Sequence, residues 1–149
     1  MFKSYMNYAL EEAKSAAARG EVPVGAVIVS DAGEVIAQAS NRTRELNDPS
    51  AHAEMLAIRA ASARLGQERL KAYDLYVTLE PCAMCAGVIS AARIRRLYYG
   101  ASDPKSGGVE QGPRIFQHSQ SHHIPEVYAG IGEQASQLLL KVFFSKLRG

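Results

Sequence analysis

Both cysteines of this chain lie in one short motif, "EPCAMC", and this placement limits how the chain can be stabilised. Cys82 and Cys85 are the only two cysteines among 149 residues. A disulfide between residues this close would close a very small loop and would constrain the unfolded chain little. A chain of this length also buries enough surface to fold without crosslinks. Three interpretations remain: a redox pair, half of a structural metal site, or half of a catalytic one.

Hydrophobic spacing predicts an alternation of helices and strands along the chain. A β-hairpin is expected where two β-branched runs flank the turn residues of "DAG". Gly20 is expected to end the first helix, and Ser50 and Gly66 are the expected N-cap and stop of the second. The predicted helices span residues 3–19, 51–66, 82–92 and 133–148, and the predicted strands span residues 24–30, 34–41, 73–79, 94–100 and 126–131.

These elements predict a single domain over residues 1–149, of the α/β class. The first two strands form an antiparallel hairpin, whereas the later strands are connected through helices. The expected architecture is a three-layer α/β/α domain with a mixed sheet of about five strands. Residues 103–125 are rich in glycine, proline and polar residues, which predicts a loop with a helical turn.

Charge and hydropathy restrict partners and location only loosely. A net charge of +2 permits a nucleic-acid partner without requiring one. A solvated face explains a basic cluster more often than RNA binding does, and the cluster here comprises Arg93, Arg95, Arg96 and Lys105. Polar residues interrupt the N-terminal segment, and the longest apolar run, "VGAVIV", is too short to cross a bilayer. A cytoplasmic protein is therefore expected.

Histidine and cysteine side chains at predicted helix starts suggest a metal site. Cys82 and Cys85 are three residues apart and share one face of a helix. The partial positive charge of a helix N-terminus favours the thiolate, which is the metal-binding form. With the imidazole of His52, two thiolates suit tetrahedral Zn²⁺ and leave one position for water, as hydrolytic sites require. Glu54 would then take a proton from that water and return protons to the substrate.

Other interpretations of these residues stay open at this level. A structural zinc site would need a further histidine, and the interval from Cys85 to the next one is much longer than in a zinc finger. The candidate histidines are His118, His122 and His123. A redox C-x-x-C motif would leave His52 and Glu54 without a role. Glu54 by itself could be a first-turn glutamate favoured by the helix dipole, and Asn41 could be a turn residue at a strand end.

The motifs "HAE" and "PCAMC" resemble those of the zinc-dependent cytidine deaminase-like superfamily. Four stretches resemble one branch of it over roughly residues 5 to 147, the bacterial tRNA adenosine deaminases that make inosine at the anticodon wobble position. They are "EVPVGAVIV", "HAEMLAIRAA", "TLEPCAMCAGVISAARIRRLYYGASDPKSG" and "LLKVFF". The resemblance implies a cytidine deaminase-like fold, one Zn²⁺ per chain, a tRNA anticodon loop as partner and a homodimer.

The resemblance also implies roles for individual residues. The implied zinc ligands are His52, Cys82 and Cys85, and the implied proton shuttle is Glu54. The positions implied to contact the nucleotide or the RNA are Asn41, Asp103, Lys105 and Phe144. After "DPKSG" and in the short tail, the chain departs from the usual family pattern. Two other functions remain: a deaminase of a free base or nucleoside, such as guanine, cytosine or cytidine, and a non-catalytic, zinc-stabilised RNA-binding module.

Overall fold

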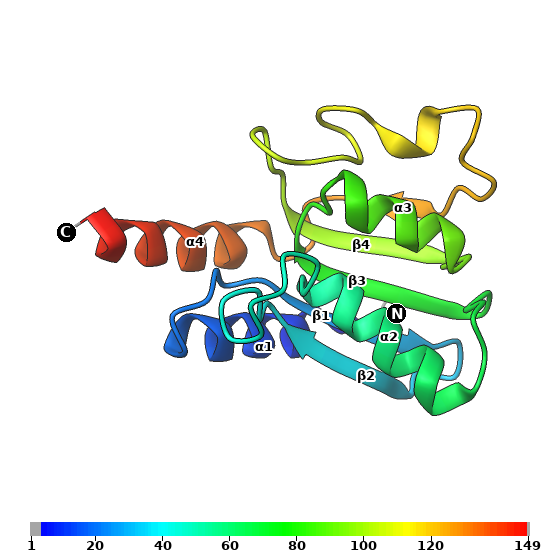
Figure 1. Cartoon of the computed structure of the whole chain (residues 1–149), viewed down its shortest axis with the longest axis horizontal. Coiled ribbons are helices and arrows are strands. Elements are labelled where there is room, and N and C mark those ends of the chain that lie inside the picture. Colours follow the sequence, from blue (N-terminus) through cyan, green and yellow to red (C-terminus); the bar gives the residue numbers. More distant parts are fainter. Residues whose placement is uncertain (1–3, 149) are drawn as a thin grey trace.

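A mixed five-stranded sheet forms the centre of the protein (Figure 1). The computed structural model describes residues 4–148. In sheet order, the strands are β2 (Val35–Ser40), β1 (Gly25–Ser30), β3 (Tyr73–Leu79), β4 (Arg96–Ala101) and β5 (Glu126–Tyr128). β1 pairs antiparallel with β2 and with β3, whereas β3, β4 and β5 run parallel. The predicted mixed sheet is confirmed.

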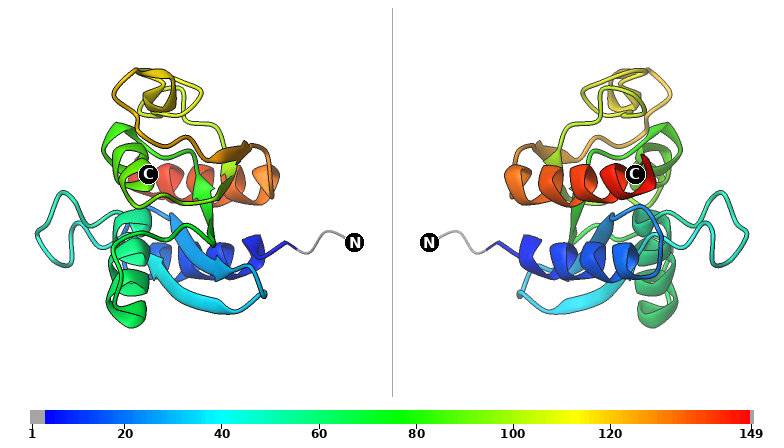
Figure 2. Two further views of the ribbon diagram at one scale, coloured as in Figure 1. Left: turned by 90° about the vertical axis from the view of Figure 1, so that its right-hand side faces the viewer. Right: turned by 90° about the vertical axis from the view of Figure 1, so that its left-hand side faces the viewer.

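Helices cover both faces of the sheet and complete the three predicted layers. One face carries α1 (Met6–Ala18) and α4 (Glu133–Arg148), which lie side by side (Figure 2). The other face carries α2 (Ala53–Leu65) and α3 (Ala83–Ala91). In Figure 1, α4 extends past the sheet toward the C-terminus. Within residues 4–148, no helix is both long and apolar enough to cross a bilayer.

Each face of the sheet has its own hydrophobic core. The larger core lies under α2 and α3 and contains fully buried aliphatic residues such as Ile28, Leu75 and Ile89. The smaller core lies under α1 and is rich in tyrosine, with the rings of Tyr76 and Tyr98 stacked 4.3 Å apart between centroids. Leu75 and Tyr76 are neighbours in β3 and belong to different cores, because successive side chains of a strand point to opposite faces.

Local sequence signals located the C-terminal ends of helices better than their N-terminal ends. Gly20 and Gly66 have positive φ angles, 83° and 67°, as expected for residues that end a helix. The prediction that Ser50 is the N-cap of α2 is wrong, because the N-cap is His52. The Ser50 hydroxyl instead donates a hydrogen bond to the Asp48 carboxylate at 2.7 Å. This local turn delays the helix by two residues, and His52 consequently lies at its N-terminal end.

Other differences from the predicted elements are small. β4 runs over residues 96–101 rather than 94–100, and α3 begins at Ala83 with Cys82 as its N-cap. β5 is shorter than predicted because it pairs with β4 over three residues only, before Gly130 and Gly132 adopt positive φ and lead into α4. The predicted helical turn after residue 103 is the 3-10 helix Ile115–Gln117. α1 begins at Met6, and residue 3 lies outside the described residues.

Candidate active site

Three strands end at the same edge of the sheet. β2 and β3 point the same way because β1 is antiparallel to both, and β4 is parallel to β3. The residues that follow these strands are Asn41, Glu80 and Ser102. In α/β sheets, ligands bind in the crevice beyond the carboxyl ends of the strands. Strand direction therefore gathers distant parts of the chain into one candidate site.

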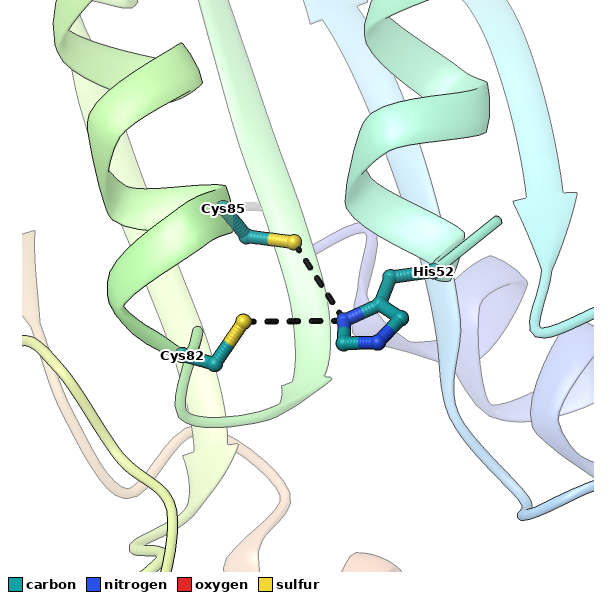
Figure 3. A group of neighbouring side chains, drawn as sticks. All are labelled: His52, Cys82 and Cys85. Atoms are coloured by element: carbon teal, nitrogen blue, oxygen red, sulfur yellow. Dashed lines mark hydrogen bonds between the residues drawn. The ribbon is translucent and has the colours of Figure 1, made fainter. Parts of the chain in front are cut away.

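His52, Cys82 and Cys85 come together at this edge of the sheet, as Figure 3 shows. His52 is the N-cap of α2 and Cys82 is the N-cap of α3, with Cys85 in the first turn. The imidazole Nδ1 atom lies 3.6 Å from the Cys82 Sγ atom and 3.5 Å from the Cys85 Sγ atom. One ligand atom of each residue lies within 4.8 Å of the other two. The N-terminal ends of α2 and α3 thus place their possible ligand atoms around one point.

The three ligand atoms fit a zinc ion. Zinc bonds of about 2.3 Å to sulfur and about 2.0 Å to nitrogen, at a tetrahedral angle, would separate the sulfur and nitrogen atoms by about 3.5 Å. The two sulfur to nitrogen distances, 3.6 and 3.5 Å, agree with that value. A set of one imidazole and two thiolates suits zinc and leaves its fourth position open.

Neighbouring groups at this site shift one another's pKa. The hydrogen bond between the thiols lowers the pKa of Cys82 to about 4. The same contact, together with burial, raises the pKa of Cys85. The hydrogen bond with Cys82 raises the pKa of His52. A metal ion binds thiolates and neutral imidazole, so it would displace these protons on binding.

Glu54 lies in the first turn of α2, next to the three possible ligands. Its side chain is 4% exposed, and burial raises the pKa of its carboxyl to about 7. A carboxyl with such a pKa changes its protonation state readily near neutral pH. The sequence suggested this residue as a proton carrier, and the buried position beside His52 is suited to that role.

A cavity of about 220 Å³ opens beside these residues. Two of the four residues that the sequence suggested for substrate binding, Asn41 and Asp103, line it. The lining residues are Val22, Val24, Asn41, Thr43, His52, Glu54, Leu79, Glu80, Cys82, Asp103 and Ser106. The other two suggested residues are not among them: Lys105 is exposed on the neighbouring loop, and Phe144 is 40% exposed on α4.

Glu80 is a site residue that no sequence motif had singled out. It directly follows β3, is 2% exposed and lines the cavity. Burial favours the neutral carboxyl, but backbone N–H donors from Asp103, Gln111, Glu110 and Val109 outweigh it and lower the pKa of Glu80. A charged residue at the end of a buried strand, next to "PCAMC", was the available signal. Its partners lie more than twenty residues away in sequence and were not foreseeable.

The three histidines of the alternative structural zinc site do not join the cysteines. His118 Nε2 lies 2.6 Å from the carbonyl oxygen of Pro113, and His123 Nε2 lies 2.6 Å from that of Ile94. Among residues 4–148, the histidine that lies with Cys82 and Cys85 is His52. The structure thus favours an open three-ligand site over a closed structural one.

Zinc-dependent base deaminases combine a histidine and two cysteine ligands with a glutamate that does not bind the metal. The fold and site of this protein have the features of that class of enzyme. A family model described as the cytidine and deoxycytidylate deaminase zinc-binding region matches residues 2–101. The "tRNA-specific adenosine deaminase" of Agrobacterium fabrum is 60% identical over 144 residues, which cover 97% of this chain and 94% of that protein.

Solved structures agree with this similarity. A tRNA:A34 deaminase studied for A-to-I editing at the wobble position of transfer RNA has 61% identity and a TM-score of 0.89, covering 91% of this chain and 98% of that chain. A guanine deaminase from Bacillus subtilis has 30% identity and a TM-score of 0.64, covering 98% of this chain and 94% of that one. The chain therefore belongs to the zinc-binding cytidine and deoxycytidylate deaminase family, in its branch of tRNA-specific adenosine deaminases.

Proposed function

We propose that this protein converts adenosine to inosine at the wobble position of tRNA anticodons and releases ammonia. The observation that carries the proposal is the convergence of His52, Cys82 and Cys85 on one point beside the buried carboxyl of Glu54. The 60% identity to a tRNA-specific adenosine deaminase supports the choice of substrate. An anticodon loop suits this chemistry because its bases are already unpaired and can be extruded at little cost.

Three side chains are proposed to hold one zinc ion. His52 would bind through its Nδ1 atom, and Cys82 and Cys85 through their Sγ atoms. A zinc ion with an open position lowers the pKa of a water molecule and so supplies a nucleophile near neutral pH. The N-terminus of α3 favours the thiolate form of both cysteines through its partial positive charge.

Glu54 is proposed to carry protons during the reaction. Its carboxylate would take a proton from the water that adds to C6 of the adenine ring, and the carboxyl would then return protons to the ring nitrogen and the departing amino group. One water is consumed, and the C6–N bond breaks to give inosine and ammonia. The buried position of Glu54 excludes competing solvent from this transfer.

The remaining cavity residues are proposed to hold the base. A cavity of about 220 Å³ is smaller than the roughly 300 Å³ at the lower end of typical ligand pockets, so it suits one base ring rather than a whole nucleotide. Asn41 and Asp103 are the proposed contacts to that nucleotide. Lys105 and Phe144, which lie outside the cavity lining, are proposed to contact the flanking RNA as a cation and a stacking ring.

We further propose that residues 1–149 form a single deaminase domain that acts as a homodimer in the cytoplasm. The exposed apolar side chains of Met84, Leu138 and Val142, each at least 40% exposed, support an assembly with a second copy. The absence of a membrane-spanning helix within residues 4–148 is compatible with this location.

Two alternatives use the same fold. The similarity to a guanine deaminase favours a free base as the second candidate substrate, with cytosine and cytidine as further options. A zinc-stabilised RNA-binding module without turnover is less favoured, because such a module needs neither an open metal position nor the buried carboxyl of Glu54.

A direct assay separates these functions. Zinc-replete protein would be incubated with bulk bacterial tRNA and, separately, with adenosine, guanine, cytosine and cytidine, and inosine and ammonia would be measured. The expected result is inosine at the first anticodon position, with the free compounds unchanged. Turnover of a free compound with unmodified tRNA would overturn the tRNA substrate, and no turnover of any substrate would favour the RNA-binding module.

A further inference from the structure

A single buried carboxylate joins the catalytic motif to a loop of the cavity wall. Glu80 lies between β3 and Cys82, and its two oxygens accept hydrogen bonds from both ends of the segment 102–111, here called the cavity loop. At one end, Oε1 accepts from the Asp103 backbone N–H at 3.0 Å and from the Ser102 hydroxyl at 3.4 Å. At the other end, Oε2 accepts from the backbone N–H groups of Val109 at 3.1 Å, Glu110 at 2.8 Å and Gln111 at 3.0 Å.

These five donors occupy the acceptor capacity of Glu80. A carboxylate offers roughly four lone-pair sites, and the five donors already exceed this number, so a further partner would have to displace one of them. Glu80 is therefore not available to exchange protons with a substrate, although it lines the cavity. Its buried negative charge is compensated by backbone N–H groups, and charge-assisted hydrogen bonds of this kind are the strong ones. The loop conformation thus depends on the Glu80 side chain.

The cavity loop also fits closely around this carboxylate. A Cβ atom on Gly107 would lie 2.6 Å from the Glu80 Cδ atom and 2.7 Å from its Oε1 atom. Gly108 packs equally closely against the first residue of α3, because a Cβ atom on Gly108 would lie 2.5 Å from the Ala83 nitrogen. The Asp103 carboxylate closes the turn by accepting hydrogen bonds from the backbone N–H groups of Lys105 and Ser106. Close packing and hydrogen bonds therefore define one loop position.

We propose that Glu80 is a positioning residue for substrate binding. It holds the cavity loop so that Asp103 and Ser106 line the same cavity as His52 and Cys82. In this way, one side chain sets the distance between the base-binding wall and the reacting centre. The inference deepens the proposed function and rests on it for the identity of the substrate.

The first test is Glu80→Gln. An amide has one acceptor oxygen, so one end of the cavity loop must face an NH₂ group instead of an acceptor, whichever way the amide is turned. The expected result is a KM for tRNA raised about tenfold, a kcat within about threefold of wild type and an unchanged zinc content. Backbone amide exchange should become faster at Asp103 or at residues 109–111. A purely structural defect would instead lower the amount of folded enzyme without changing its KM.

Two further variants complete the design. Gly107→Ala leaves the Glu80 carboxylate intact but places a Cβ atom 2.6 Å from both the Glu80 Cδ atom and the Asp103 carbonyl oxygen, so the loop must shift. It should raise KM in the same way and replaces Glu80→Gln if that variant does not fold. Glu68→Gln is the matched control, because Glu68 is exposed and lies outside both the cavity lining and the cavity loop. The control should keep wild-type KM and wild-type amide exchange.

The outcomes separate this inference from the proposed function. Wild-type KM and wild-type exchange in Glu80→Gln and Gly107→Ala would overturn the role of Glu80. Loss of zinc from Glu80→Gln would also overturn it, because the carboxylate would then support the metal site. If wild-type protein makes no inosine in tRNA, the proposed function fails, and the KM comparison is made with the free base that it does deaminate. If no base is deaminated, the amide exchange of the two variants decides whether Glu80 holds the loop.

Discussion

The two sides of the cavity are built in different ways. The metal side consists of His52, Glu54, Cys82 and Cys85, which belong to two short motifs at the N-terminal ends of α2 and α3. The proposed substrate side consists of Asn41 and the cavity loop, which is held by hydrogen bonds to Glu80 across more than twenty residues of sequence. The family model matches residues 2–101 and ends where the cavity loop begins. The shared region thus contains the metal side and Asn41, and the cavity loop lies beyond it.

This difference suggests a division of labour. Helix ends packed on a sheet hold ligand atoms rigidly, so the metal side can keep one chemistry in relatives that act on different bases. A loop can change its length and contacts without disturbing the sheet, so the substrate side can set the choice of base. The similarity of this chain to a tRNA deaminase and to a guanine deaminase is consistent with that view.

The largest effect is expected from removing one of the metal ligands. Cys85→Ala deletes a buried ligand and should abolish zinc binding and activity and lower the melting temperature. Metal analysis and thermal unfolding would measure these changes. Chelation should destabilise wild type but leave the variant unaffected, because a bound ion stabilises only the state that binds it. A variant that retains zinc would contradict the assignment of Cys85.

The next effect concerns proton transfer without loss of metal. Glu54→Gln keeps the shape of the side chain but cannot carry a proton, and it should lower kcat by about 10²- to 10⁴-fold with zinc retained. Single-turnover assays with metal analysis would measure both quantities. The exposed Glu68 provides the control, and Glu68→Gln should leave kcat unchanged. Near-normal turnover in a folded Glu54→Gln protein would remove Glu54 from the mechanism.

Substitution on the substrate side should change binding rather than chemistry. Asn41→Ala removes a buried amide that lines the cavity, and it should raise KM about tenfold with zinc and most of kcat retained. Steady-state kinetics with tRNA would measure the split between KM and kcat. Asn7→Ala, on the exposed face of α1 and outside the cavity lining, is a matched asparagine control that should leave KM unchanged. Loss of zinc from Asn41→Ala would break the distinction between the two sides.

The smallest effect is expected outside the cavity. Lys105 is an exposed cation, so Lys105→Ala should weaken tRNA binding by only a few fold. Removing one phosphate contact should reduce the slope of log K against log salt by about 0.7 for single-stranded RNA. Binding measured at several salt concentrations tests this, with Lys71→Ala, at the opposite edge of the sheet, as the control. An unchanged slope would exclude a phosphate contact at Lys105.

Sequence by itself determined the elements and the chemical groups of the metal side. Alternating apolar patterns predicted the mixed sheet and its helices, and "HAE" with "PCAMC" contained all four residues of the metal side. These signals are local, because hydrophobic periodicity and motif spacing are defined by residues that are near one another in sequence. The Ser50 prediction failed although the cause is also local: a serine before a helix is a common cap, but the Ser50 hydroxyl donates instead to Asp48, two residues earlier.

Tertiary structure alone decided which distant residues meet. The common direction of β2, β3 and β4 brings Asn41, Glu80 and Asp103 to one edge, and burial between packed elements raises the pKa of Glu54 to about 7. No local pattern indicates that the Glu80 carboxylate accepts hydrogen bonds from both ends of the cavity loop. Strand direction, burial and long-range hydrogen bonds exist only once the sheet has formed. They place the residues of the sequence motifs beside a cavity whose wall is held in position.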